Sequence, residues 1–102
     1  MKDVTQDTIN LLTKYIVDFV HPAKVILFGS YARGDADRHS DLDFAVEGGS
    51  LSDASWHRLL GSLENQYFTL LPIDLVRLEE APDKLKTNIL KEGIVLYDAR
   101  KN

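Results

Sequence analysis

The sequence contains no cysteine among its 102 residues. Without thiol groups, neither a disulfide framework nor a zinc site with thiolate ligands can form. Long apolar runs are also missing, and no run approaches the length that spans a membrane. The first seven residues contain no apolar signal core. A cytoplasmic protein without a membrane partner is therefore expected.

Positive charge is scarce, because 12 lysine and arginine residues face 16 aspartate and glutamate residues, for a formal net charge of -4. A broad basic surface that binds nucleic acid is therefore not expected. A nucleotide substrate remains compatible with this charge, because bound metal ions reverse the field around a carboxylate cluster. The length fits one domain, so residues 1–102 are predicted to form a single domain.

The apolar pattern predicts helices and strands in the order α-β-turn-β-α-β-α-β. Helices are predicted over residues 4–20 and 52–66, with a last helix from Pro82 to just before Gly93. Strands are predicted over residues 24–28, 41–46, 73–78 and 94–97, with a helical turn through residue 33. Ser52 is expected to cap its helix, with Leu51 packed on Trp56.

This order predicts a small α/β (α+β) fold in which helices pack on a mixed sheet. The helix between the second and third strands lets these two strands run parallel through a right-handed crossover. The first and second strands are joined only by a turn and a loop, which favours an antiparallel pair.

Gly29 and Ser30 follow the first strand directly, where the short helical turn is predicted. Glycine lets a ligand approach the backbone closely, and exposed amides at a helix start favour phosphate. The Ser30 hydroxyl can add one hydrogen bond. Alone, such a pair is more often a turn with a helix cap than a phosphate site.

Three aspartates carry the second signal. Asp41 and Asp43 open the second strand and are expected to share one face, about 6–7 Å apart. A divalent cation relieves their repulsion, and carboxylate oxygens suit magnesium or manganese; the alternative is an exposed polar strand start.

Asp74 lies within an apolar run, where an unpaired acid is costly to bury. Parallel pairing would bring it level with Asp41 and Asp43; the alternative is that it faces solvent on an edge strand.

Residues 29–43 read Gly-Ser-Tyr-Ala-Arg-Gly-Asp-Ala-Asp-Arg-His-Ser-Asp-Leu-Asp, with ten residues between Ser30 and Asp41. This spacing resembles the signature of the polymerase-β nucleotidyltransferase superfamily. More closely, the chain resembles the minimal nucleotidyltransferases, small proteins usually paired with an all-helical HEPN protein. The resemblance extends from the first helix through Asp74 and implies the palm-like fold of that superfamily.

The resemblance implies a role for each matched residue. Gly29 and Ser30 would grip the triphosphate of a nucleotide such as ATP. Arg33 would neutralise phosphate charge, although an exposed arginine near an acidic loop is an equal alternative.

The same resemblance implies that Asp41 and Asp43 hold two Mg²⁺ ions, with Mn²⁺ as a substitute. Asp74 matches the third family carboxylate by position, and it would bind one metal and help activate the attacking hydroxyl. Two ions of this kind lie roughly 3.5–4 Å apart, one beside the acceptor hydroxyl and one beside the pyrophosphate.

The site predicts the donor chemistry and leaves the acceptor open. The leading hypothesis is an antitoxin that transfers AMP from ATP to a tyrosine of a HEPN ribonuclease toxin. One alternative is a nucleotidyltransferase for a small molecule whose pocket a helical partner supplies. The other is an antitoxin that neutralises its partner by contact alone.

Four further residues near the motif receive no catalytic role. His39 is expected on the surface, and Asp35 and Asp37 are expected to be solvated loop acids. Tyr31 either lines the nucleotide pocket or packs in the core.

Overall fold

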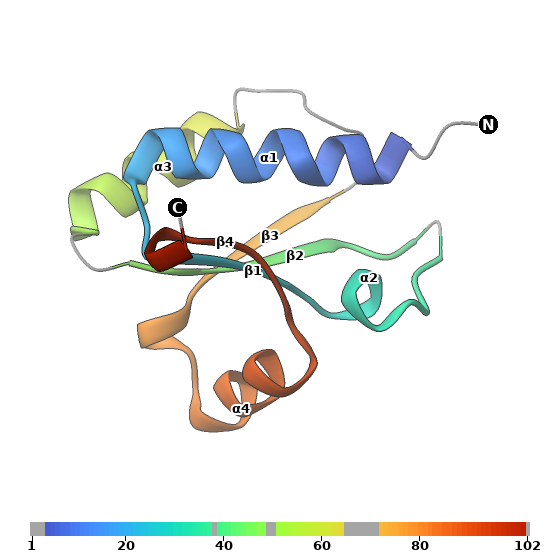
Figure 1. Ribbon diagram of the computed structural model, residues 1–102. Coiled ribbons are helices and arrows are strands. Elements are labelled where there is room, and N and C mark those ends of the chain that lie inside the picture. The colour runs from blue at the N-terminus through green and yellow to red at the C-terminus, as the bar shows by residue number, and fades with distance from the viewer. Residues whose placement is uncertain (1–3, 38, 49–50, 65–71, 102) are drawn as a thin grey trace.

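The computed structural model describes residues 4–37, 39–48, 51–64 and 72–101. A four-stranded sheet forms its middle layer, with helices α1 and α3 on one face and α4 on the other (Figure 1). The elements are α1 (Val4–Val20), β1 (Lys24–Phe28), α2 (Ser30–Arg33), β2 (Leu42–Glu47), α3 (Asp53–Glu64), β3 (Ile73–Arg77), α4 (Asp83–Glu92) and β4 (Ile94–Asp98), with 3-10 helices at Leu78–Glu80 and Ala99–Lys101. The predicted order of elements is confirmed.

Several predicted boundaries were wrong by one residue. Strand β2 begins at Leu42 rather than Asp41, because its pairing with β3 starts at Leu42, and it ends at Glu47 rather than Val46. Strand β3 ends at Arg77, since Leu78 turns into a 3-10 helix. Pro82 is the N-cap of α4 instead of its first residue, and β4 continues to Asp98.

The second long helix ends at Glu64 among the described residues, and its predicted end near residue 66 lies outside them. It begins at Asp53, one residue later than the predicted range, with Ser52 at the predicted N-cap position. The Ser52 hydroxyl accepts a hydrogen bond from the Ser55 backbone N–H at 3.1 Å and so caps the helix. Leu51 and Trp56 are buried in the same core cluster, as the predicted staple requires.

The sheet is mixed, with strand order β3-β2-β1-β4. β1 runs antiparallel to β2 and to β4, while β2 and β3 are parallel. Both predicted strand relations are therefore confirmed. β3 and β4 form the two edges of the sheet.

The hydrophobic core is divided between the two faces of the sheet. On the face covered by α1 and α3, the larger cluster includes Leu12, Ile16, Val25, Leu27 and Phe44. A smaller cluster lies on the α4 face and consists of Ile26, Ala45, Leu78 and Ile89. No helix of the described ranges is both long enough and apolar enough to cross a membrane.

Candidate active site

Two of the predicted aspartates face each other across neighbouring strands. Asp43 of β2 and Asp74 of β3 are register partners in the parallel pair. Because side chains alternate along a strand, Asp43 lies on the same face as Ala45, which is the face of α4. Asp74 is exposed and lies on an edge strand. Both expectations for Asp74 thus hold in part: it is solvent-exposed, and it is also level with Asp43.

The charges around Asp43 act strongly on its carboxyl group. Partial burial, followed by the negative charges of Asp74 and Asp41, raises the pKa of Asp43 to about 6, while the positive charge of Arg33 opposes the rise. Asp41 lies just before β2 and is exposed. The structure therefore brings the three predicted carboxylates into one electrostatic cluster, with Asp43 as its most desolvated member.

The backbone of Gly29 lies directly against Asp43 of this cluster. It lies between β1 and α2 with φ 75° and ψ -155°, a conformation available essentially only to glycine. A Cβ atom at position 29 would collide with the Asp43 carboxylate. The glycine thus lets the start of α2 lie directly beside the acid.

Helix α2 begins at Ser30, directly after Gly29, and brings the charge of Arg33 close enough to act on Asp43. Its turn is closed by bonds from the backbone amides of Ala32 and Arg33 to the Gly29 carbonyl, at 3.1 and 3.0 Å. As at the start of any helix, the amides before these are not used by the turn itself and are available to an anion.

The guanidinium of Arg33 is held by two other acids. Arg33 Nε donates to Asp35 Oδ2 at 3.2 Å, and Arg33 Nη1 lies 3.7 Å from Glu92 Oε2. The hydrogen bond to Asp35 raises the pKa of Arg33 above its ordinary value. Arg33 is thus an exposed arginine beside an acidic loop and also a positive charge within reach of Asp43.

The loop between α2 and β2 is ordered by Asp37. Its Oδ1 accepts the His39 backbone N–H at 2.8 Å, and its own N–H donates to Ser40 Oγ at 2.9 Å. His39 is exposed, as are Asp35 and Asp37, which agrees with the expected surface positions.

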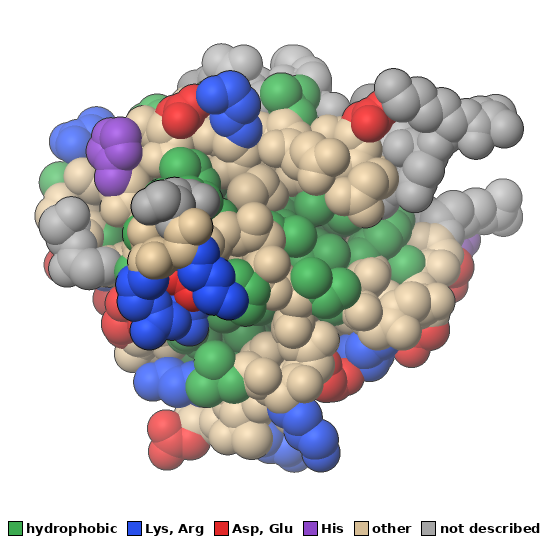
Figure 2. Space-filling model, in the orientation of Figure 1, with side chains coloured by type: hydrophobic (Ala, Val, Ile, Leu, Met, Phe, Trp, Pro, Cys, Tyr) green, Lys and Arg blue, Asp and Glu red, His purple; other side chains and the backbone are tan. Residues whose placement is uncertain are grey.

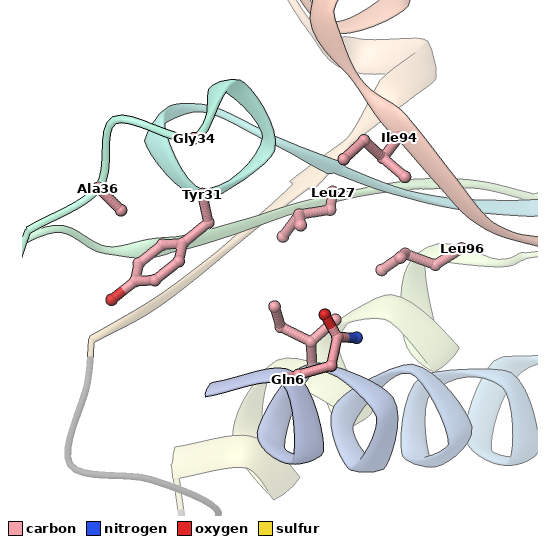
Figure 3. A pocket seen from close by; sticks show the side chains of 8 residues that line it. Gln6, Leu27, Tyr31, Gly34, Ala36, Ile94 and Leu96 are labelled. Atoms are coloured by element: carbon pink, nitrogen blue, oxygen red, sulfur yellow. The ribbon is translucent and has the colours of Figure 1, made fainter. Parts of the chain in front are cut away.

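Tyr31 lies on the other side of α2 from the carboxylates. It packs against the larger core cluster and lines a hollow of about 430 Å³ together with Leu27, Ile94 and Leu96. In Figure 3 Leu27, Ile94 and Leu96 lie together on one side of the hollow opposite the start of α1, and the Tyr31 ring extends from α2 on the other side. Figure 2 shows hydrophobic side chains gathered in the middle of this side of the molecule. The hollow is on the α1 face of the sheet and separate from the aspartates.

The sequence places these features in a known family. The family described as "Polymerase beta, Nucleotidyltransferase" matches residues 10–102. The chain belongs to this family.

A curated relative of this nucleotidyltransferase family member agrees with the assignment. Putative protein adenylyltransferase MJ1547 of Methanocaldococcus jannaschii is 30% identical over 73 residues, which are 72% of this chain and 53% of the relative. The match thus spans about half the length of that relative.

Solved structures share the fold. A chain in the crystal structure of a toxin-antitoxin with AMP-PNP has a TM-score of 0.69 and 26% identity, covering 92% of this chain and 75% of that one. The structure of a tri-AMPylated Shewanella oneidensis HEPN toxin in complex with MNT antitoxin gives a TM-score of 0.61 at 24% identity, over 94% of this chain and 74% of the other. The second match shows a shared fold.

The nucleotidyltransferase family implies divalent metal, and the donor set of this chain suits it. Among residues 4–37, 39–48, 51–64 and 72–101, no three histidine, aspartate or glutamate side chains already form a metal cage. Magnesium, however, is usually held by one or two carboxylates together with substrate phosphates. Asp43, crowded by Asp41 and Asp74, is a carboxylate whose charged form a cation would stabilise. The residues therefore fit a hard divalent ion.

One polar residue of the site was missed by sequence reasoning. Glu92 at the end of α4 contacts Arg33, although 58 residues separate the two in the chain. No local motif marks it, because the contact arises only when α4 packs on the sheet beside α2. Asp35 was placed in the loop correctly, but its bond to Arg33 was not predicted.

Proposed function

We propose that this chain is a metal-dependent nucleotidyltransferase that transfers a nucleoside monophosphate, AMP from ATP, to a hydroxyl group. The observation that carries the proposal is the close approach of the Gly29 backbone to Asp43, which lies opposite Asp74 in the sheet. A turn that binds the triphosphate and a carboxylate cluster that binds metal ions can act on the same nucleotide, because the two are in direct contact. We further propose that residues 1–102 act as one catalytic domain.

The donor nucleotide is bound through its triphosphate in this proposal. The first amides of α2 and the Ser30 hydroxyl donate hydrogen bonds to phosphate oxygens. Arg33 adds positive charge at the end of the same short helix. Because Gly29 has no side chain, the phosphates can lie against the backbone next to Asp43.

The chemical step is a displacement at the α-phosphorus. The acceptor oxygen forms a bond to this phosphorus, the bond from phosphorus to the oxygen of the β-phosphate breaks, and pyrophosphate leaves. Asp41 and Asp43, with Asp74, would hold the metal ions, which when bound lower the pKa of the acceptor hydroxyl and neutralise the leaving group. Asp74 is solvent-accessible and is assigned to assist removal of the hydroxyl proton. The protein mainly positions the reactants and stabilises charge.

A tyrosine of an all-helical HEPN toxin is the proposed acceptor, with this chain as the antitoxin. Two facts about other proteins support this choice. A relative at 26% identity occurs in a toxin-antitoxin structure with AMP-PNP, and the M. jannaschii relative carries a protein adenylyltransferase name. The spacing between Gly29-Ser30 and the Asp41–Asp43 pair agrees with the minimal nucleotidyltransferases.

The test is a transfer assay with two labels. The protein, Mg²⁺ and lysate of its source organism are incubated with ATP labelled at the α-phosphate and, in parallel, at the γ-phosphate. The Asp43→Asn variant serves as the control. Label from α-ATP alone on one protein band, absent with the variant, is the expected result. Mass spectrometry then identifies the acceptor residue.

Other outcomes contradict the proposal at different levels. Label from γ-ATP on the band would indicate phosphoryl transfer. α-Label confined to small molecules would favour a small-molecule acceptor. No transfer from any of the four nucleotides by a folded sample would leave neutralisation by contact as the better account.

A further inference from the structure

Arg33 is the meeting point of two elements that are far apart in the sequence. Asp35 contacts its Nε, and Glu92 lies near its Nη1, so the two acids meet different nitrogens of the guanidinium. Asp35 belongs to the loop after α2, whereas Glu92 is the last residue of α4. The guanidinium of this exposed arginine thus has one acidic partner in the loop after α2 and another at the end of α4.

The end of α4 is well anchored. A Cβ atom at Gly93 would collide with the Ile26 side chain and the Ile89 carbonyl, so this residue lies tightly against β1. The Gly93 backbone N–H donates to the Ile89 carbonyl at 2.8 Å and closes the helix. Ile89 itself is fully buried. Glu92 is therefore presented from a rigid corner whose position is set by β1, the strand that leads into Gly29.

We propose that Glu92 is a positioning residue, which holds Arg33 in place to receive the triphosphate of the donor nucleotide. The inference rests on the proposed function. Glu92 contacts neither of the paired aspartates in this arrangement and acts through Arg33. Its role is to immobilise a long side chain before the nucleotide arrives.

The direction of the effect follows from two opposing terms. Removing Glu92 also removes a negative charge near the phosphate site, which would by itself favour ATP. Ordering a flexible arginine during binding costs free energy, and the contact between Glu92 and Arg33 avoids that cost by ordering the side chain beforehand. With side chains 44% and 34% exposed, the ion pair is largely screened, so the effect is modest. We expect ordering to dominate.

The experiment compares Glu92→Gln with Asp83→Asn, which removes one acid from the opposite end of the same helix. Each variant is assayed for KM of ATP, kcat and the Kd of ATP by calorimetry, in the wild-type background and with Arg33→Gln. Glu92→Gln should raise KM and Kd about two- to fivefold with little change in kcat. Asp83→Asn should leave all three unchanged. In the Arg33→Gln background, Glu92→Gln should no longer raise KM.

A spectroscopic readout separates positioning from general stability. The chain has five arginines, so the Arg33 Nε–H resonance can be assigned by substitution. Relaxation of this resonance should show an ordered Arg33 side chain in the wild type and a mobile one in Glu92→Gln, while the melting temperature of the two proteins is the same. A lower or unchanged KM in Glu92→Gln, or an equal rise in the Arg33→Gln background, would overturn the inference. An inactive wild type that also fails to bind ATP would instead overturn the proposed function.

Discussion

Asp43 is a carboxylate in unfavourable surroundings when no cation is bound. Its pKa is raised to about 6, first by burial and then by Asp74 and Asp41. The unfolded chain ionises this group near its ordinary pKa of 3.8. Between pH 4 and 6 the unfolded state therefore releases the proton first, and the stability that protonated Asp43 gives to the fold is lost as pH rises.

The Asp43→Asn variant should remove this dependence. In buffer with EDTA, the free energy of unfolding of the wild type should fall relative to the variant between pH 4 and 6, and the difference should stay constant above pH 6. Urea titrations at half-unit pH intervals measure it. A difference that is flat from pH 4 to 7 would show that the group is not perturbed.

Gly29 offers a second test at a single position. Gly29→Ala requires a non-glycine residue at φ 75° and forces a methyl group against the Asp43 carboxylate. We expect a loss of about 1–3 kcal/mol in the free energy of unfolding. ATP binding should also be lost, because the methyl group occupies the space beside the acid.

The control for this change is Gly61→Ala within α3, where a Cβ atom meets nothing within 4 Å. It should stabilise the protein by about 0.5–1 kcal/mol, because alanine suits a helix interior better than glycine. Equal effects of the two substitutions in denaturant titrations would argue against a special role for Gly29.

Sequence reasoning identified the candidate residues of the site but not all of their contacts. The spacing of Ser30, Asp41 and Asp43 is local, so it can be read from the chain. The contact between Arg33 and Glu92 depends on how α4 packs, and no pattern within either segment specifies it.

At the scale of elements, the parallel pairing of β2 and β3 determines which acids meet. The register places Asp74 opposite Asp43. Removing the charge with Asp74→Asn should lower the pKa of Asp43 below about 6. It should remain above 3.8, because burial is the larger cause of the shift. Carboxyl ¹³C resonances followed through a pH titration give the value.

Asp83→Asn is the matched control for this titration, since α4 carries it away from the aspartate cluster. It should leave the pKa of Asp43 unchanged. If Asp74→Asn also left it unchanged, the register of β3 against β2 would be wrong.

The elements themselves were largely predictable, since each has a local signal. Apolar periodicity marks α1, and Pro72 and Gly93 punctuate the segments around β3 and β4. The errors fall at strand ends. Asp41 was assigned to β2 from the local sequence alone, whereas pairing with β3 decides where the strand begins.

For the whole molecule, binding of a divalent ion should couple to folding. An ion that relieves repulsion in the native cluster binds the folded chain and not the unfolded one. At an ion concentration of about ten times its Kd, binding adds roughly 1.4 kcal/mol to the free energy of unfolding. For a domain near this size, each kcal/mol raises Tm by about 4–8 °C. Thermal melts with Mg²⁺ or Mn²⁺ against EDTA at pH 7.5 measure this shift.

The doubly substituted Asp41→Asn/Asp43→Asn protein should show no such shift, since the proposed ligands are gone. An equal rise in the variant would indicate that the ions act elsewhere on the protein.

The arrangement of the whole sheet was only partly predictable. The antiparallel and parallel pairs follow from the lengths of the connections, and both are confirmed. The placement of β4 beside β1 could not be read from the sequence, because pairing between distant strands is set by packing on both faces at once.

The position of β3 at the edge of the sheet has a kinetic consequence. A strand with a neighbour on one side can detach and re-anneal at a lower free energy than β1, which is paired on both sides. Asp74 would leave with it, whereas Asp43 would stay with β2. We expect β3 amides to exchange with deuterium sooner than those of β1. The lifetime of the complete carboxylate set would then be that of a fraying strand, far shorter than the lifetime of the fold.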